Sequence, residues 1–403
     1  MTRALVLSPE PVRDRMAGMG IRALKVAETL RAHGHEVTLA AAGGVDGQSA
    51  GDLRALDLHG PGFAGAARGA ELAVASGHTA ERLYGAGFEG ALVADLYDPF
   101  LVENLSYAGT LGPGVLVNDR RALFLLCDRA DLVLAASEEQ RLFYLGLLLG
   151  RRRLDAATLG ADPELRRTVA VAPFGVSEAA PGPARPHPTL GAGGHDVLFG
   201  GVYDWYDPDL VLEAWPRVVA SVPDARLVFS TSPNPASTPQ ERLAAARQRA
   251  GEAGLLGRSV FVVEWVPYAE RGGFYRSFRA AVLVHRPSLE AALSFRTRVL
   301  DYLWAGLPAV ATEGGAASRL LQSSGAGLVV PPRPEDLARA LVALLTDDEL
   351  HRSLSGRATE AARDLTWSRT LAPLLEFASA PVRRKRPSRL ASAVSGVARR
   401  LAR

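Results

Sequence analysis

The sequence predicts an α/β protein built from doubly wound, Rossmann-like domains. Short apolar runs of strand length alternate with segments of helical spacing, and residues 4–7 and 36–42 flank a helix at 21–34. The same alternation resumes at residue 196, after a stretch at 177–195 whose Pro, Gly and Ala content is typical of a linker. A chain of 403 residues is long enough for two or three domains, each with its own core.

This pattern divides the chain into five parts. We expect an N-terminal domain at 1–176, a linker at 177–195, a second domain at 196–365, a short helix at 366–380 and a basic tail at 381–403.

Charge and cysteine content exclude several classes of function. The formal net charge is +3, but residues 381–403 carry eight positive charges and no acid; subtracting those eight leaves the rest at −5. A mildly acidic body argues against a broad nucleic-acid-binding surface. A single cysteine, Cys127, rules out a disulfide framework and a cysteine metal site, and the eight histidines are scattered. We therefore expect neither a bound metal nor a resident cofactor.

The termini predict a cytoplasmic protein with one point of membrane contact. The N-terminal apolar run is too short for a signal peptide, and the most apolar run, 142–150, is too short to span a bilayer. In the tail, Leu390, Val394, Val397 and Leu401 fall on one helical stripe among arginines. Such a basic amphipathic helix indicates peripheral contact with an anionic membrane surface at the inner face; the alternative is a solvated, disordered tail.

Residues 285–313 combine a strand end, a polar loop, a short helix and a second strand. Ser294 or Thr297 can cap the helix, and Gly306 ends it. Arg296 and Arg298 lie at the helix start, where free backbone N–H groups already favour an anion. The segment therefore predicts a diphosphate-binding cradle, with surface arginines on an ordinary strand–helix–strand unit as the alternative.

Two groups of residues in the first domain follow strands of the predicted sheet. Gly18, Gly20 and Arg22 come after the first strand and indicate anion binding, although no G-x-G-x-x-G fingerprint is present and a flexible loop is the alternative. Asp95, Tyr97 and Asp98 come at the end of the strand in 90–100, where ligands collect in open α/β sheets. These three residues are candidates for a functional site; a turn before a proline is the alternative for Asp98.

Two motifs carry a resemblance to a known family. Residues 301–312, DYLWAGLPAVAT, and residues 326–341, AGLVVPPRPEDLARAL, resemble the donor-site motifs of GT-B glycosyltransferases, and of retaining family 4 in particular. The resemblance implies two Rossmann-like domains facing across a cleft, with the C-terminal helix crossing back to the first domain. It also implies a sugar donor activated by a nucleotide.

The resemblance assigns roles to individual residues. Asp301 takes the place of a glutamate that holds the donor ribose, while a second glutamate that contacts the sugar has Leu293 in its position and Glu290 as the nearest acid. The loop after the first strand of the second domain, GGVYDWYDP, lacks the family's Arg and Lys pair, so Arg296 and Arg298 are expected to supply the missing charge. The remaining residues assigned to donor binding are Tyr203, Trp205, Trp265, Val266, Tyr268, Ser294, Phe295 and Thr297.

Together these observations predict a glycosyltransferase that moves a sugar from a nucleotide-sugar donor to an acceptor hydroxyl, with retention. The residues expected to take part in catalysis are Asp95, Tyr97, Asp98 and Arg298. The nucleotide sugar would be a co-substrate, and the acceptor a saccharide, a lipid-linked molecule or a small natural product, in cell-envelope polysaccharide, glycolipid or natural-product synthesis. The rival hypotheses are a catalytically silent GT-B scaffold or binding protein and a nucleotide-sugar epimerase.

Overall fold

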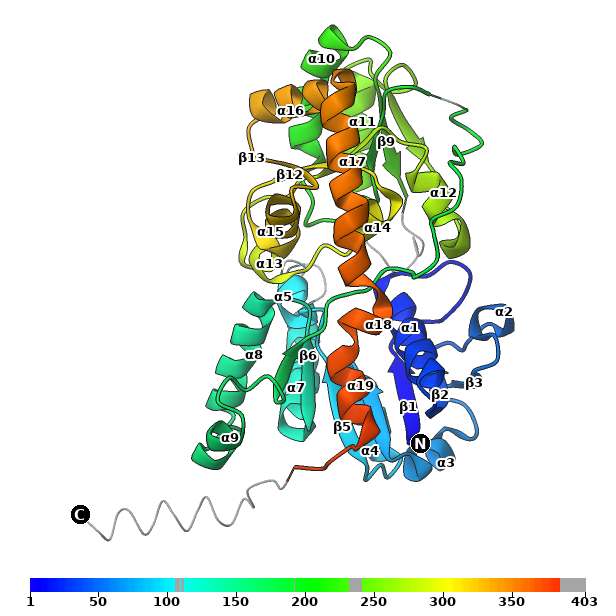
Figure 1. Ribbon diagram of the computed structural model, residues 1–403, viewed down its shortest axis with the longest axis vertical. Helices are drawn as coiled ribbons and strands as arrows, with labels where there is room; N and C mark the ends of the chain where they lie inside the picture. The colour runs from blue at the N-terminus through cyan, green and yellow to red at the C-terminus, as the bar shows by residue number, and fades with distance from the viewer. Residues whose placement is uncertain (106–108, 110–111, 192, 232–240, 385–403) are drawn as a thin grey trace, which may run out of the picture.

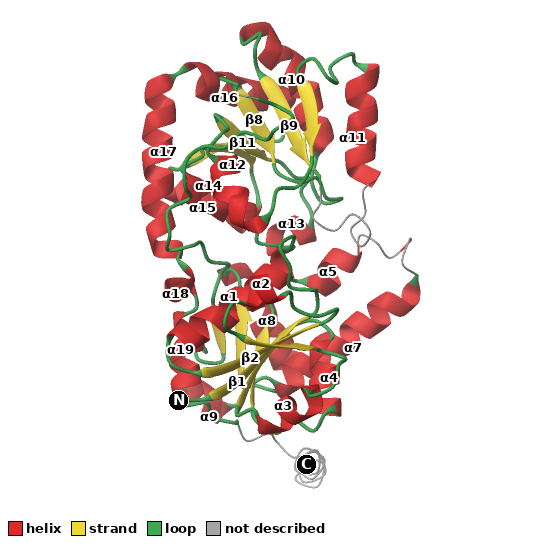
Figure 2. Cartoon of the chain, turned by 90° about the vertical axis from the view of Figure 1, so that its right-hand side faces the viewer, coloured by secondary structure: helices red, strands yellow, loops and turns green. Residues whose placement is uncertain are grey.

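The structure, a computed structural model, describes residues 1–105, 109, 112–191, 193–231 and 241–384. Two parallel β-sheets, each covered by helices, form two lobes that stack end to end (Figures 1 and 2). The prediction of two Rossmann-like α/β domains is confirmed.

The first sheet has seven parallel strands in the order β3-β2-β1-β4-β5-β6-β7. Its strands are β1 (Arg3–Ser8), β2 (Glu36–Ala41), β3 (Arg54–Asp57), β4 (Leu72–Ala75), β5 (Ala91–Asp95), β6 (Leu132–Ala135) and β7 (Val169–Val171). Its helices are α1 (Gly18–Ala32), α2 (Gly47–Ala50), α3 (Phe63–Gly69), α4 (Thr79–Gly85), α5 (Phe100–Leu105), α7 (Pro113–Arg129), α8 (Glu138–Gly150) and α9 (Ala156–Ala161). The strand order reverses between β1 and β4, which places a ligand crevice at the carboxyl end of β1.

The second sheet has six parallel strands in the order β10-β9-β8-β11-β12-β13. Its strands are β8 (Asp196–Phe199), β9 (Arg226–Ser230), β10 (Val260–Val263), β11 (Ala280–Leu283), β12 (Ala309–Thr312) and β13 (Gly327–Val330). Around them lie α10 (Pro208–Ser221), α11 (Glu241–Glu252), η1 (Tyr268–Glu270), α12 (Arg271–Tyr275), α13 (Leu289–Leu293), α14 (Arg298–Ala305), α15 (Gly315–Ser324), α16 (Pro334–Thr346) and α17 (Asp348–Ala362). Its reversal falls between β8 and β11, next to α14.

The central strands of both sheets are short, apolar and buried, as expected when helices cover both faces of a parallel sheet. All four residues of β4, β8, β11 and β12 are buried. This packing fixes the carboxyl ends of the strands, where the loops that carry polar side chains begin.

The end of the chain crosses from the second domain back to the first. Helix α17 runs along the second domain, and η2 (Arg363–Leu365), α18 (Trp367–Thr370) and α19 (Ala372–Ser379) then lead down beside the first (Figure 1). The ring of Trp367 lies 4.6 Å from that of Phe174, and the Thr2 hydroxyl donates to the Ala378 carbonyl at 2.8 Å. Gly175 is required at this crossing, because a Cβ there would lie 2.7 Å from Cα of Trp367. The predicted crossing helix is present as two short helices.

Local details differ from the prediction at both helix starts of interest. Helix α1 begins at Gly18 rather than Ile21, so Gly18 and Gly20 belong to its first turn instead of a preceding loop. Helix α14 spans Arg298–Ala305, and Gly306 follows in the left-handed conformation as the predicted helix stop, but neither proposed cap forms. Thr297 makes no capping bond, and the Ser294 hydroxyl instead donates to Glu103 at 3.2 Å.

The predicted membrane contact falls largely outside the described residues, since Leu390, Val394, Val397 and Leu401 all follow residue 384. Within the described ranges, no helix has both the length and the apolar character that crossing a bilayer requires.

Candidate donor site

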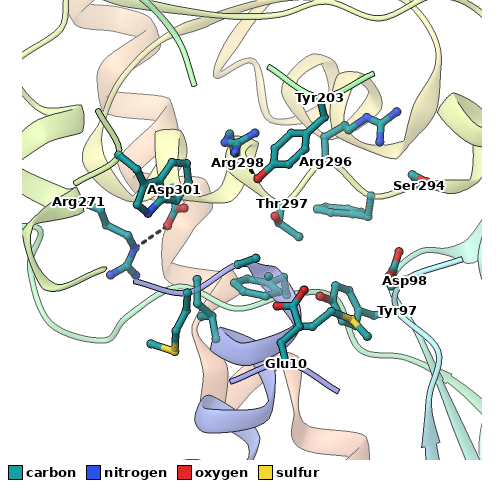
Figure 3. A pocket seen from close by; sticks show the side chains of 18 of the residues that line it. Glu10, Tyr97, Asp98, Tyr203, Arg271, Ser294, Arg296, Thr297, Arg298 and Asp301 are labelled. Atoms are coloured by element: carbon teal, nitrogen blue, oxygen red, sulfur yellow. Dashed lines mark hydrogen bonds and ion pairs between the residues drawn. The ribbon is translucent and has the colours of Figure 1, made fainter. Parts of the chain in front are cut away.

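A cavity of about 400 Å³ lies between the two domains, at the carboxyl ends of both sheets (Figure 3). The two domains are tied together at its edge: the Gln140 amide donates to the carbonyls of Tyr97 and Leu293, at 2.9 Å each. Most of the predicted site residues line this cavity: Gly18, Tyr97, Asp98, Tyr203, Trp205, Trp265, Val266, Tyr268, Ser294, Phe295, Arg296, Thr297, Arg298 and Asp301. Four do not: Gly20, Arg22, Asp95 and Glu290.

Arg298, the first residue of α14, is a buried cation with no acid partner in the described part of the chain. Its side chain bonds only to the Gly201 carbonyl, at 3.3 Å, and the Tyr203 hydroxyl, at 3.4 Å, while its Nε has no partner. The residue is 9% exposed, and its guanidinium lies 5.0 Å from the Tyr203 ring and 5.3 Å from that of Trp265. A buried guanidinium with unfilled donors on a cavity wall is suited to an anionic ligand.

The loop after β8 is shaped around this arginine. A Cβ at Gly201, whose φ is +67°, would fall on the Arg298 guanidinium, and one at Gly200 would lie 3.1 Å from Cδ of Arg298. The two glycines that follow β8 therefore leave the space into which Arg298 extends from α14. This arrangement explains how the loop can lack a basic pair of its own and still have a positive charge beside it.

Arg296 differs from Arg298 although only one residue separates them. Both of its terminal nitrogens donate to the carboxylate of Glu290, one of them at 2.6 Å, and both residues are buried. Its guanidinium also lies 5.5 Å from the Trp205 ring and 5.3 Å from that of Tyr206. Glu290 is thus committed to Arg296 and does not line the cavity, which corrects its expected contact with the donor sugar.

Asp301 lines the cavity and is held by an arginine that the sequence did not single out. Nε of Arg271 donates to Oδ1 of Asp301 at 3.1 Å, and the Arg271 guanidinium lies 3.8 Å from the Tyr268 ring and 4.7 Å from that of Trp304. Arg271 starts α12, 30 residues before Asp301 in the chain. In the sequence, only the aromatic residues near Arg271 hinted at a role for it, and they do not predict that its partner is Asp301.

Arg22 and Asp95 pair with each other rather than facing the cavity. Two nitrogens of Arg22 donate to the carboxylate of Asp95, at 2.6 and 2.9 Å, and its other bonds go to the carbonyls of Ala172 and Pro173. Arg22 is 1% exposed and Asp95 is 6% exposed. Their expected roles in anion binding and catalysis are therefore replaced by a structural one. Gly20 is also covered, since a Cβ there would lie 3.1 Å from the Pro11 carbonyl.

Among the described residues of the first domain, three carboxyl groups line the cavity: Glu10, Asp98 and Glu103. Of these, the sequence singled out only Asp98. Burial raises the pKa of all three carboxyls, and neighbouring negative charge raises it further for Asp98 and Glu103. Asp98 and Glu103 hydrogen bond to each other. The backbone N–H of Gly20 acts on the pKa of the Glu10 carboxyl in the opposite direction to burial, so the first turn of α1 already faces an acid of the same chain.

The Tyr97 side chain is buried beside these acids. Burial raises the pKa of its hydroxyl well above the ordinary value, and the charge of Asp98 acts in the same direction. A Cβ at Gly18 would lie 3.1 Å from that hydroxyl, so the glycine gives Tyr97 room at the cavity wall. Among the described residues there is no cluster of three His, Cys, Asp or Glu side chains that could hold a metal ion.

Comparison with known proteins identifies the second domain. Residues 194–347 match the family described as Glycosyl transferases group 1. The second domain is therefore similar to the group 1 glycosyltransferases. This match covers α14, Arg298 and Asp301, and with the two-domain architecture it confirms the predicted resemblance to GT-B glycosyltransferases.

Curated relatives match part of the chain. It is 30% identical over 223 residues to a phosphatidyl-myo-inositol mannosyltransferase of Mycolicibacterium smegmatis, covering 54% of this chain and 52% of the relative. It is 30% identical over 174 residues to a D-inositol 3-phosphate glycosyltransferase of Nocardia farcinica, covering 43% of this chain and 37% of the relative. The chain thus spans about half or less of the length of the curated relatives it matches.

Solved structures share the fold over nearly the whole chain. Sucrose-phosphate synthase from Thermosynechococcus elongatus aligns with a TM-score of 0.63 at 16% identity, covering 93% of this chain and 98% of that one. HepE from Anabaena, in complex with UDP-glucose, aligns with a TM-score of 0.66 at 14% identity, covering 94% and 100%. At these identities the likeness shows the fold alone.

Proposed function

We propose that the protein transfers a sugar from a nucleoside diphosphate sugar to an acceptor hydroxyl, with retention at the anomeric carbon. Arg298 is the observation that carries the proposal. It is a buried cation without an acid partner in the described chain, its Nε has no partner, and it lies at a helix start inside the group 1 domain. A diphosphate is the ligand group that such a site would bind most strongly.

The rest of the donor would follow the wall of the second domain. Asp301, fixed through one oxygen by Arg271, would accept hydrogen bonds from the ribose hydroxyls. Trp265, Val266 and Tyr268 would pack around the base. That HepE was solved with UDP-glucose on the same fold supports a uridine nucleotide as the first donor to try.

The chemistry would exchange one bond for another at the anomeric carbon. The bond from that carbon to the diphosphate oxygen breaks, and a bond to the acceptor oxygen forms on the same face. The acceptor proton passes to the departing diphosphate, whose growing negative charge Arg298 and the first-turn N–H groups of α14 would stabilise. Tyr97 and Asp98, on the opposite wall, would orient the acceptor.

A screen of uridine and guanosine diphosphate sugars tests this proposal. Slow release of nucleoside diphosphate in water, accelerated by an acceptor, is the expected result. Conversion of the donor into an epimeric sugar without release would favour an epimerase, and binding without turnover would favour a silent scaffold. Failure of every nucleotide and nucleotide sugar to raise the melting temperature would overturn the donor site.

Residues 381–403 would add contact with an anionic membrane surface, which suits a lipid-linked acceptor. Support comes from the tail's eight positive charges without an acid. We expect deletion of 385–403 to weaken binding to phosphatidylglycerol vesicles several-fold while leaving the melting temperature unchanged. Equal vesicle binding by the deletion variant would contradict this role.

A further inference from the structure

The two walls of the cavity carry opposite charge. The first domain contributes Glu10, Asp98 and Glu103, and the second contributes Arg271, Arg296 and Arg298 beside Asp301. Figure 3 shows Glu10 and Asp98 on one side of the cavity and Arg296 and Arg298 on the other. A ligand that bridges the cavity would meet cations at one end and carboxyl groups at the other.

The acidic wall has no cation of its own. Among the described residues of the first domain that line the cavity, none is Arg, Lys or His. Arg22, a buried cation of that domain, is committed to Asp95 and to two backbone carbonyls. On the opposite wall, Arg296 is committed to Glu290. Among the described residues that line this end of the cavity, no guanidinium therefore remains free to bind a second anionic group.

The carboxyl groups are arranged to bind hydroxyls. Asp98 and Glu103 hydrogen bond to each other, and Glu103 also accepts the Ser294 hydroxyl across the domain boundary at 3.2 Å. Oε2 of Glu10 is buried and has no partner. Carboxyl groups that line a cavity match the O–H donors of a polyhydroxyl compound, whereas a phosphate or carboxylate would add negative charge beside these acids.

We infer that the acceptor is an uncharged polyhydroxyl group, such as a neutral sugar residue, with no phosphate or carboxylate on the part that enters the cavity. This inference rests on the proposed function, because it assigns the acceptor to the end of the cavity that the donor leaves open. Like-charge contact at a desolvated site would disfavour a phosphorylated acceptor by at least about tenfold.

Matched pairs of compounds test the acceptor class. The probes are glucose against glucose 6-phosphate and myo-inositol against inositol 3-phosphate, each at constant ionic strength. The readout is the change each compound causes in the rate of nucleoside diphosphate release from the donor. The neutral member of each pair should change the rate at a concentration at least about tenfold lower than its phosphate ester. An equal response within both pairs, including no response to any of the four compounds, or a preference for the esters, would overturn the inference.

Variants assign the preference to the acidic wall. The double variant Glu10→Gln, Glu103→Gln should reduce the ratio between the effective concentrations of the phosphate ester and the neutral compound. The control variant Glu252→Gln, the same change on α11 away from the cavity, should leave that ratio unchanged. An unchanged ratio in the double variant would contradict the assignment. Calorimetric binding of uridine diphosphate to the wild-type protein is measured separately, because loss of that binding alone would count against the donor site rather than the acceptor class.

Discussion

Two helix starts from different domains lie near the same cavity, and they differ in whether an acid of the chain already occupies them. At the start of α1, the N–H of Gly20 faces the Glu10 carboxyl of the same chain and lowers its pKa against the larger effect of burial. At the start of α14, Arg298 has no acid partner among the described residues, and its Nε is unbonded. Glycines and free N–H groups therefore do not by themselves define an anion site. What distinguishes α14 is that the described part of the chain supplies no carboxylate to neutralise Arg298.

The largest expected effect comes from removing that cation. We expect Arg298→Ala to lower kcat/KM for the nucleotide sugar by about 100-fold or more, because the charge that develops on the diphosphate loses its stabilising partner. Arg298→Lys should restore only part of the loss, since an ammonium cannot bind two phosphate oxygens with a planar fork. The control is Arg333→Ala, an exposed arginine that pairs with Asp336. A loss of less than threefold for Arg298→Ala would contradict the comparison between the two helix starts.

The neighbouring arginine should affect stability more than binding. Glu290→Gln would leave Arg296 buried without its counter-ion, and we expect a loss of about 3 kcal/mol in the free energy of unfolding. Glu335→Gln breaks an exposed pair with Arg217 and should cost no more than about 1 kcal/mol. Urea unfolding of the two variants measures the difference. Equal losses would show that the buried pair is not the structural element we describe.

The sequence was sufficient for the architecture and for the α14 segment because both depend on local patterns. Apolar runs, helical spacing and Gly306 specify strands, helices and a helix end from neighbouring residues alone. Which charged residues pair with each other cannot be predicted from neighbouring residues in this way. Arg22 lies 73 residues from Asp95, and Arg271 lies 30 residues from Asp301, so only the folded chain shows which charges are neutralised.

The residues that the sequence missed follow the same logic. Glu10 and Glu103 carry no motif, and they become part of the cavity because the carboxyl ends of β1 and β5 lie near each other in the sheet. Conversely, Gly20 and Arg22 had an anion-binding pattern but are covered by the first domain's own packing. A pattern of residue types predicts where a helix starts. It does not predict which side chains of the same chain pack against the first turn.

A smaller effect is expected at the start of α1. Glu10→Gln keeps an oxygen beside the Gly20 N–H but removes the carboxyl group that can carry a negative charge. We expect uridine diphosphate to bind about threefold more tightly, because one like charge is removed from the cavity at a helix start. Isothermal titration calorimetry measures the change. Weaker binding in this variant would show that the carboxyl group assists the donor, and the two helix starts would then not be opposites.

The smallest expected effect is a change in how stability depends on pH. Burial, followed by the charge of Glu103, raises the pKa of Asp98 above its unfolded value of about 4. The folded state therefore holds this proton more tightly, and the stability it contributes is lost as pH rises from about 4 through the raised pKa. The Asp98→Asn variant has no carboxyl proton to lose. The melting temperature of the variant minus that of the wild type should therefore increase as the pH rises. A constant difference across this range would contradict the prediction.

The most direct test of the Arg298 site compares uridine diphosphate with uridine monophosphate by isothermal titration calorimetry, for the wild type and for Arg298→Ala. The second phosphate should contribute about tenfold or more in affinity to the wild-type protein. In the variant most of that difference should disappear while binding of the monophosphate changes little. If the variant discriminates between the two nucleotides as strongly as the wild type does, Arg298 does not bind the diphosphate, and the account of this site is wrong.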